Sequence, residues 1–250
     1  MAVPIPDITL LRRSCAPCTL RQFCQQAGLT QRAAPASSLG KPFGVARGDS
    51  LFRAGDSEGR VFAVRSGALK TLAVTPDGEE HVLGFHLPGE LLGLDSLATG
   101  LHCVEAVALS ESQVCEIPLQ GLLNRGATNP DLGVRLLQVL GGNAMGSRVH
   151  VDLLLRRQAD ERVAVFLYDL LLRYGKGGAN SSLMLPMGRE DVGRYLGLAL
   201  ETVSRSLTRL QEDGLIEVSG RSVRILDEER LRHMAMLPDT PSGPPLERQA

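Results

Sequence analysis

The sequence predicts an α+β protein: an N-terminal antiparallel β-roll, then a long helix, then a winged helix-turn-helix. Short apolar runs separated by glycine turns occupy residues 45–118, and an apolar seam with helical spacing follows Pro130. Two short helical patterns and two short strands come near the C-terminus. Many short strands with glycine turns are typical of antiparallel rolls and barrels, and the later patterns are typical of packed helices.

The composition favours a globular protein of ordinary size. The chain has 250 residues, of which 43% are hydrophobic, and its net charge of −1 gives no sign of a nucleic-acid partner. The N-terminus lacks the apolar core of a secretion signal, and no apolar run approaches the roughly eighteen residues of a membrane span. We therefore expect a cytoplasmic protein that has no membrane partner.

The cysteines give the first indication of chemistry. Cys15-x2-Cys18-x5-Cys24 places three thiols in one short segment, and Cys103 and Cys115 follow far along the chain. In a reducing compartment cysteines more often bind metals or act in catalysis than form disulfides. An iron–sulfur cluster usually takes four thiolates, so Cys103 or Cys115 would supply the fourth. Either of these two could instead be a small buried hydrophobic residue.

Other uses of the cysteines stay open. The spacing does not fit a zinc finger, which repeats a C-x2–4-C pair with a second pair or with histidines. Zinc with a distant fourth ligand, a catalytic thiol and structural cysteines are the remaining alternatives. We expect residues 1–27 to form an arm that carries the cysteine cluster.

The β-roll is predicted over residues 28–128. Val61–Val64 and Leu69–Val74 are rich in the β-branched and aliphatic residues that strands prefer. Pro76, Asp77 and Gly78 follow the second of these runs, and this order is typical of a hairpin turn.

A long helix is predicted over residues 129–157. Its seam alternates spacings of three and four, the a/d pattern of a coiled coil, at Leu137, Leu140, Ala144, Ser147, Val151 and Leu154. Gly141, Gly142 and Gly146 each lower its helix propensity by about 1 kcal/mol. We expect this helix to pair with its copy in a homodimer, weakly enough to be switched. A helix packed inside one chain is the alternative.

A winged helix-turn-helix is predicted over residues 158–232, with a disordered tail at 233–250. Its three helices and two strands are expected at Ala159–Tyr174, Arg189–Leu196, Leu200–Glu212, Leu215–Val218 and Ser222–Leu226. A tight glycine-containing turn separates the two short helices, and a second one separates the strands.

The second helix of such a motif enters the major groove of DNA with its first turns. Glu201, Ser204 and Arg205 share one face there. Arginine can bind guanine, glutamate can accept from cytosine and serine is adaptable. Further residues that could contact the duplex are Thr202, Arg194, Arg209, Arg221 and Arg224. Glu201 and Arg205 could also form an ordinary surface pair.

Five ordered stretches carry a family resemblance: the cysteine motif, GFHLPGELLGLDSL at 84–97, VCEIP at 114–118, ADERVAVFLYDL at 159–170 and GREDVGRYLGLALETVSRSL at 188–207. On these stretches the chain resembles the cyclic AMP receptor superfamily of bacterial regulators, and within it the fumarate-and-nitrate-reduction (FNR) oxygen regulators. The resemblance runs from about Cys15 to Leu231. It implies a β-roll like that of cyclic-nucleotide-binding domains and a transcription activator rather than an enzyme.

The resemblance also implies a cofactor and a switch. Cys15, Cys18, Cys24 and Cys115 would bind a [4Fe–4S] cluster, because VCEIP is similar to the context of the family's fourth ligand. The cluster would favour the DNA-binding dimer, and oxygen would convert or destroy it and release the DNA. The arginine–serine pair of cyclic-nucleotide pockets is absent after residue 97, where the chain reads ATGLHCVEA, so nucleotide phosphate binding is not expected.

Two partners follow from the same resemblance. The DNA target would be a TTGAT-type inverted repeat read by Glu201, Ser204 and Arg205. The expected contact with RNA polymerase is a short loop that could equally be a solvated hairpin tip; its residues are Thr75, Asp77, Gly78 and Glu79.

Three positions depart from the family pattern. Ala199 stands where a threonine often caps the recognition helix, and loss of such a cap costs about 1 kcal/mol. Ser147 lies on the seam where some relatives carry an acid whose repulsion resists pairing. Cys103 is an additional thiol with no assigned role.

Two further function classes stay open. A regulator of the same fold could sense haem or a small effector through His81, His86 or His102, or could respond to thiol oxidation. A zinc or iron–sulfur enzyme is the second class, although the sequence has no phosphate loop, no Ser–His–Asp arrangement and no paired-acid signature.

Overall fold

The computed structural model describes residues 42–57, 59–174 and 181–235. These residues form two compact units, one of residues 42–69 and 86–139 and the other of residues 70–85 and 140–235. The predicted cysteine arm, with Cys15, Cys18 and Cys24, and residues 236–250 of the predicted tail lie outside the described part of the chain. The first three residues of that tail, 233–235, are helical instead.

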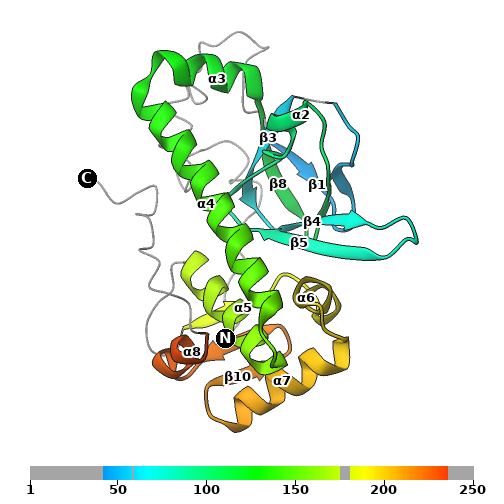
Figure 1. Cartoon of the computed structure of the whole chain (residues 1–250), viewed down its shortest axis with the longest axis vertical. Helices are drawn as coiled ribbons and strands as arrows, with labels where there is room; N and C mark the ends of the chain where they lie inside the picture. The colour runs from blue at the N-terminus through cyan, green and yellow to red at the C-terminus, as the bar shows by residue number, and fades with distance from the viewer. Residues whose placement is uncertain (1–41, 58, 175–180, 236–250) are drawn as a thin grey trace, which may run out of the picture. The chain divides into compact units, whose positions relative to one another are not determined.

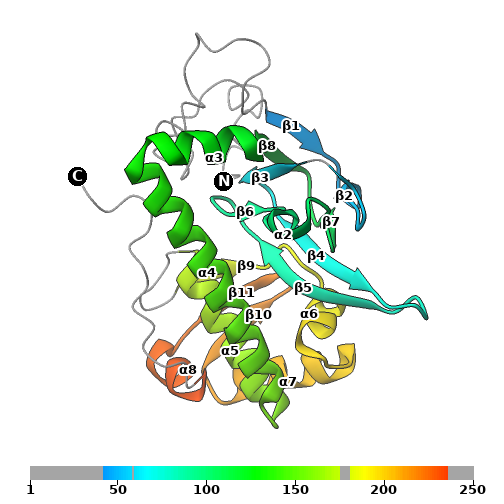
Figure 2. The ribbon, with the colours of Figure 1, turned by 45° about the horizontal axis from the view of Figure 1, so that its top comes forward.

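The first half of the chain forms two four-stranded sheets, with the strand orders β1-β8-β3-β6 and β2-β7-β4-β5. Figure 1 shows these strands on one side of the long helix, and Figure 2 labels each of them. The pairs β1–β8, β3–β8 and β2–β7 are antiparallel. The strands are β1 (Pro42–Val45), β2 (Ser50–Phe52), β3 (Arg60–Ser66), β4 (Leu69–Val74), β5 (Glu80–His86), β6 (Leu91–Leu92), β7 (Glu105–Ala108) and β8 (Ser112–Pro118). The short helix α2 (Ser96–Thr99) lies between β6 and β7.

The predicted hairpin turn joins β4 to β5. The Thr75 amide donates to the Glu79 carbonyl and the Gly78 amide to the Thr75 carbonyl, each at 2.9 Å. Gly78 has a φ of +85°, a left-handed conformation that glycine adopts without steric cost. Asp77, Gly78 and Glu79 are exposed at this tip.

The centre of the roll is the pairing of β3 with β8, where Val61 lies opposite Ile117 and both are fully buried. Leu122 and Leu132 close the same apolar cluster. Leu122 belongs to α3 (Leu119–Thr128), a helix that the sequence analysis did not predict. Its only fully buried apolar side chain is Leu122, so α3 depends on packing against the sheet more than on a strong periodic pattern.

The long helix α4 runs unbroken from Pro130 to Leu155 (Figure 2). Proline suits its first position because the ring presets the helical φ and the missing amide has no partner there. The whole predicted seam is exposed in the single chain, at Leu137, Leu140, Ala144, Ser147, Val151 and Leu154. Leu137 alone exposes 69% of its surface, so this face is unused within the described chain.

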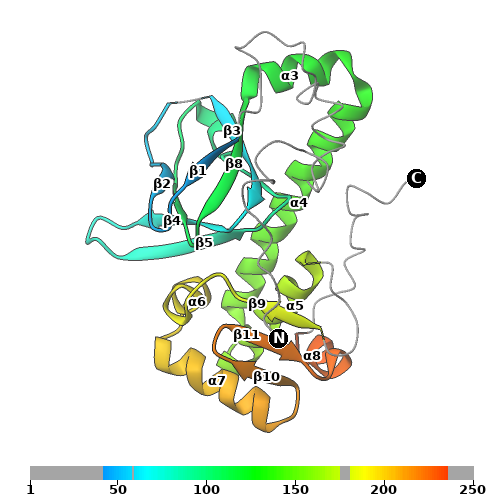
Figure 3. The ribbon, with the colours of Figure 1, turned by 180° about the vertical axis from the view of Figure 1, so that it is seen from behind.

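The second half of the chain is a helical domain with a small sheet (Figure 3). Its helices are α5 (Ala159–Arg173), α6 (Arg189–Leu196), α7 (Leu200–Glu212) and α8 (Glu228–Ala235). The strands β9 (Ser182–Met184), β10 (Ile216–Ser219) and β11 (Ser222–Ile225) form one sheet in the order β10-β11-β9.

The predicted α+β fold, with antiparallel sheets first and a helix-turn-helix last, is confirmed. α6 and α7 begin and end at the expected residues. The expected two-stranded wing has a third strand, β9, whose Leu183 pairs with Val223 and is fully buried. α8 was not predicted either; it packs on α5, and its Leu231 is buried. Neither β9 nor α8 is long enough to show a clear period.

Candidate nucleic-acid interface

The turn between α6 and α7 depends on two glycines. Gly197 ends α6 with a φ of +62°, and the Leu198 amide donates to the Gly193 carbonyl at 2.9 Å. A Cβ on Gly193 would lie only 2.6 Å from the Leu198 carbonyl oxygen. This close approach brings α6 and α7 together at the fixed angle of a helix-turn-helix.

The recognition helix α7 has one buried face and one exposed face. Val203, Leu207 and Leu210 are buried, and Glu201 and Arg205 are exposed. Ala199 is the N-cap residue of α7 and makes no side-chain cap bond. This was expected, because alanine has no side-chain oxygen that could accept from the first amides of the helix. The exposed first turns are therefore the part of α7 that can enter a groove.

The exposed face of α7 borders a shallow hollow of about 490 Å³ lined by Arg189, Ser204, Arg205, Thr208 and Arg209. These residues supply guanidinium and hydroxyl donors and no carboxylate, a composition that suits phosphate oxygens. Arg189 Nη1 donates to Ser204 Oγ at 3.2 Å. Arg189 was not among the predicted DNA contacts, because only the fold shows that the first side chain of α6 reaches across to α7.

Two of the predicted contacts are engaged by acids inside the same compact unit. Arg209 pairs with Asp160 at 3.2 Å. Arg194 bonds Glu190 at 2.9 Å and also pairs with Glu80. Arg205, in contrast, has no carboxylate partner among the described residues. Of Arg194, Arg205 and Arg209, Arg205 is therefore the one whose charge is most available to DNA.

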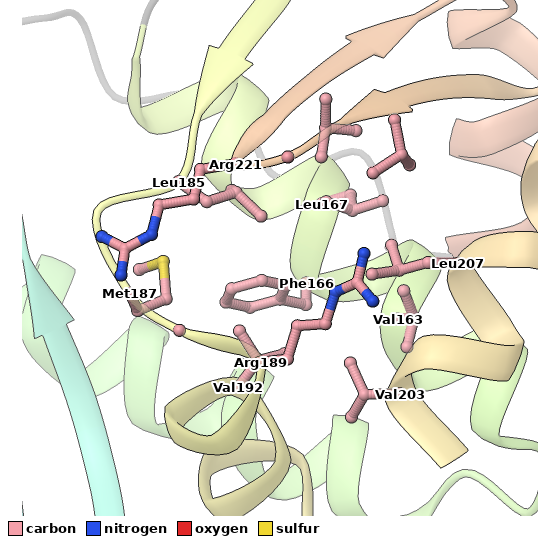
Figure 4. A pocket seen from close by; sticks show the side chains of 14 residues that line it. Val163, Phe166, Leu167, Leu185, Met187, Arg189, Val192, Val203, Leu207 and Arg221 are labelled. Carbon is pink, nitrogen blue, oxygen red and sulfur yellow. The ribbon is translucent and has the colours of Figure 1, made fainter. Parts of the chain in front are cut away.

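An apolar pocket of about 400 Å³ lies behind this surface, between α5, α6, α7 and the β10–β11 wing. Figure 4 shows Phe166 and Leu167 inside it, with the guanidinium groups of Arg189 and Arg221 among the same lining side chains. Arg221 Nη1 donates to the Pro186 carbonyl at 3.3 Å. The wing thus adds a further cation, Arg221, to the lining of this pocket, which shares Arg189 with the hollow.

Comparisons with known proteins agree with this architecture. A Crp-like helix-turn-helix domain matches residues 161–234, and a cyclic nucleotide-binding domain matches residues 43–129. The transcriptional activator protein FnrA of Stutzerimonas stutzeri is 42% identical over 218 residues, which cover 85% of this chain and 88% of FnrA. The chain belongs to the Crp/FNR family of DNA-binding transcription regulators.

Other Crp/FNR regulators match over nearly the full chain. The activator anr of Pseudomonas aeruginosa is 40% identical over 94% of this chain and 98% of its own. The fumarate and nitrate reduction regulatory protein of Escherichia coli K12 is 33% identical over 92% and 97%. The structure of FixK2 from Bradyrhizobium japonicum superposes with a TM-score of 0.72 at 29% identity, covering 80% of this chain and 98% of FixK2. FnrA, anr and the Escherichia coli protein are named as transcriptional activators or regulatory proteins, and none of the three names is that of an enzyme.

The roll of this Crp/FNR regulator holds Cys115 in the middle of β8. Cys115 lies opposite Ala63 of β3 on one side and Pro42 of β1 on the other. It is half-buried, and it packs on the edge of the cluster around Val61 and Ile117. Pro42, which pairs with Cys115, is the first residue of β1.

Cys103 has a different environment. It is exposed in the loop before β7, where its amide and its Sγ both approach Asp95 Oδ2, at 2.8 and 3.5 Å. Partial burial raises the pKa of the Cys103 thiol, and the hydrogen bond and negative charge of Asp95 raise it further. These effects favour the protonated thiol over the thiolate that binds metals.

Two of the candidate histidines, His81 and His102, have different surroundings. His102 is buried, stacks on Phe52 with ring centroids 3.8 Å apart, and lies 3.3 Å from Asp95 through Nδ1. His81 is on the surface of β5, 3.8 Å from Glu79. Within the described ranges no three His, Cys, Asp or Glu side chains gather to hold a metal ion.

None of the described helices combines the length and apolar character needed to cross a lipid bilayer.

Proposed function

We propose that this protein is an oxygen-responsive transcription regulator whose [4Fe–4S] cluster, bound by Cys15, Cys18, Cys24 and Cys115, favours the DNA-binding dimer under anoxia. The observation that carries the proposal is the position of Cys115 on β8, beside the strand that continues from the cysteine segment. A bound cluster would supply the oxygen-reactive centre. The protein contributes four soft thiolates, which match the usual ligand number of such a cluster.

The donor chemistry favours Cys115 over Cys103 as the fourth ligand. Asp95 places a carboxylate against the Cys103 sulfur, and a thiolate there would meet a like charge. The register neighbours of Cys115 across the sheet are Ala63 and Pro42, and both are uncharged. Seventeen residues lie between Cys24 and Pro42 in the chain, a length that allows the cysteine segment to reach β8.

The dimer is proposed to form along the exposed seam of α4. Leu137, Val151 and Leu154 expose 69%, 58% and 40% of their surfaces. A seam of this kind buries its apolar side chains when two helices pair. The small residues Ala144 and Ser147 at its centre contribute little apolar area, so pairing stays weak enough for the cluster to bias it.

The proposed DNA target is an inverted repeat of the TTGAT type. Arg205 would bind a guanine, and Glu201 would accept a hydrogen bond from the amino group of a cytosine. Ser204 and Thr202 would contact the edges of the neighbouring bases. Arg194 and Arg209 would contact phosphates once they exchange their present carboxylate partners for the duplex. A dimer presents two such helices to half-sites about 34 Å apart.

Activation is proposed to use the β4–β5 tip. Thr75, Asp77, Gly78 and Glu79 form a hydrogen-bonded and largely exposed turn that could contact RNA polymerase. Relatives such as FnrA carry the name transcriptional activator, and we extend that role to this chain.

The decisive test is iron and acid-labile sulfide per chain in protein purified without oxygen. Four of each are expected, with loss of the cluster and of specific DNA binding on exposure to air. Cys18→Ser and Cys115→Ser should abolish the chromophore and the oxygen response. Cys103→Ser is the matched control and should retain both.

The opposite results would overturn the proposal. Little iron and sulfide after anoxic reconstitution would leave a DNA-binding regulator whose signal is a different one. Loss of the cluster in Cys103→Ser with retention in Cys115→Ser would reverse the ligand assignment. For DNA, Arg205→Ala should cost about 1–3 kcal/mol at one guanine position. An equal loss on all sequences would make Arg205 a phosphate contact.

A further inference from the structure

The last turn of α6 receives two side-chain hydrogen bonds from outside the helix. The final carbonyls of a helix have no partner within it and need donors from elsewhere. The Tyr195 carbonyl accepts from His150 Nε2 at 2.8 Å, and the Leu196 carbonyl accepts from Arg162 Nη1 at 2.9 Å. His150 lies on α4 and Arg162 on α5. The end of α6, from which the turn to α7 departs, is therefore held by both helices.

The contact of His150 is more than one hydrogen bond. Its ring stacks on the Tyr195 ring with centroids 4.0 Å apart and an interplanar angle of 9°. Tyr195 in turn contacts Phe166 of α5, with ring centroids 5.8 Å apart. A backbone carbonyl and an aromatic face of the same residue thus fix the position of His150.

Arg162 connects the C-terminal ends of α4 and α6. Its Nε donates to the Arg156 carbonyl at 2.9 Å, just beyond the end of α4, while its Nη1 reaches Leu196. A Cβ on Gly197 would lie 3.5 Å from both Arg162 Nη1 and Leu154 Cδ2. One planar guanidinium therefore spans the carbonyl ends of α4 and α6.

The same turn of α4 carries the proposed dimer seam. Val151, next to His150, exposes 58% of its surface, and Leu154 exposes 40%. One side of this turn is available to a second copy while the other side holds α6. We propose that His150 and Arg162 are positioning residues that fix the helix-turn-helix to the dimer helix, so that pairing along α4 sets the orientation of the two α7 helices. This inference rests on the proposed dimer and its DNA target.

The test separates orientation from folding and from pairing. The full chain, purified without oxygen, is titrated onto three duplexes: the inverted repeat, the same repeat with its half-sites one base pair further apart, and a scrambled sequence. The dimer dissociation constant is measured separately by sedimentation. The variants are His150→Ala, His150→Gln and Arg162→Lys. Met145→Ala is the control, at an exposed position of α4 outside the seam.

His150→Ala should weaken binding to the inverted repeat about tenfold, the effect of losing one such contact to a buried element. It should also reduce the preference for the correct half-site spacing. Binding to the scrambled duplex and the dimer constant should stay unchanged. His150→Gln keeps a donor for the Tyr195 carbonyl and should recover most of the loss. Met145→Ala should match the unaltered chain on every duplex.

Arg162→Lys keeps the charge but loses the planar fork of the guanidinium, and should show the same selective loss of binding to the inverted repeat. It serves as the test if His150→Ala does not fold. Unchanged affinity and spacing preference in folded His150→Ala would overturn the positioning role alone. A parallel fall in dimerisation and thermal stability, without rescue by glutamine, would overturn it in favour of a purely structural role. Failure of the unaltered chain to distinguish the repeat from the scrambled duplex would instead refute the proposed function.

Discussion

The Cys103 sulfur lies 3.5 Å from Asp95 Oδ2, the same oxygen that accepts the Cys103 amide proton at 2.8 Å. Together with partial burial, this carboxylate raises the pKa of the thiol above its ordinary value of 9.0. A raised thiol pKa means that the nucleophilic thiolate is scarcer at any pH below it. We therefore expect the exposed Cys103 thiol to react slowly with electrophiles.

Alkylation of Cys103 by iodoacetamide should be slower at pH 8 in the folded protein than in guanidinium, and should accelerate only at higher pH. Asp95→Asn removes the charge, lowers the pKa and should increase the rate at pH 8. Peptide mass spectrometry of the Cys103 peptide gives the rate over a pH series. Equal rates for folded and denatured protein would contradict this environment.

Replacement of Gly193 by alanine should destabilise the helix-turn-helix. The new Cβ would meet the Leu198 carbonyl oxygen at 2.6 Å, and relief requires the turn to open. We expect a loss of about 1–3 kcal/mol in the free energy of unfolding, with a larger loss of specific DNA binding. Denaturant unfolding and fluorescence anisotropy measure the two effects.

Gly142→Ala is the control for this substitution. Gly142 lies on α4 with nothing within 4 Å of its Cβ position, so alanine should stabilise the helix by up to about 1 kcal/mol. If both alanine variants behaved alike, the close approach at Gly193 would not limit the turn.

The uncapped start of α7 offers a stabilising substitution. Ala199→Thr supplies an oxygen for the free amides of the first turn and should raise the free energy of unfolding by about 1 kcal/mol. Ala199→Val has nearly the same shape without the oxygen and should give no gain. Thermal unfolding of the two variants compares them directly, and an equal gain in both would assign the effect to packing.

An acid on the seam should weaken the dimer. In the paired state Ser147→Asp would place two like charges near each other across α4, and the dimer dissociation constant should increase several-fold, by about 1 kcal/mol. Ser147→Asn is the uncharged control and should change it little. Sedimentation at low and high salt provides the check, because screening should reduce the effect of the charge. If Ser147→Asp left the dimer dissociation constant unchanged, the two chains would pair through a surface other than the seam of α4.

Local patterns explain why much of the fold was predictable. The 3.6-residue period of α7 and the glycine after α6 are encoded within a dozen residues, so the bounds of both helices could be predicted. The tip at Gly78 was predictable for the same reason, since its turn chemistry is local. α3, β9 and α8 were missed because each is short and gains its stability from packing on a distant element.

The sequence by itself determined the α+β order, the helix-turn-helix and the spacing of the cysteines, because these depend on periodicity and neighbouring residues. Only the tertiary structure decided which side chains meet. The tertiary structure forms the hydrogen bond from Arg189 to Ser204, the ion pair of Arg209 with Asp160 and the hydrogen bond from His150 to the Tyr195 carbonyl. It also gave Cys103 and Cys115 different surroundings, although both had been candidates for the same role. Contacts between distant residues depend on how the elements pack, and no local pattern records that packing.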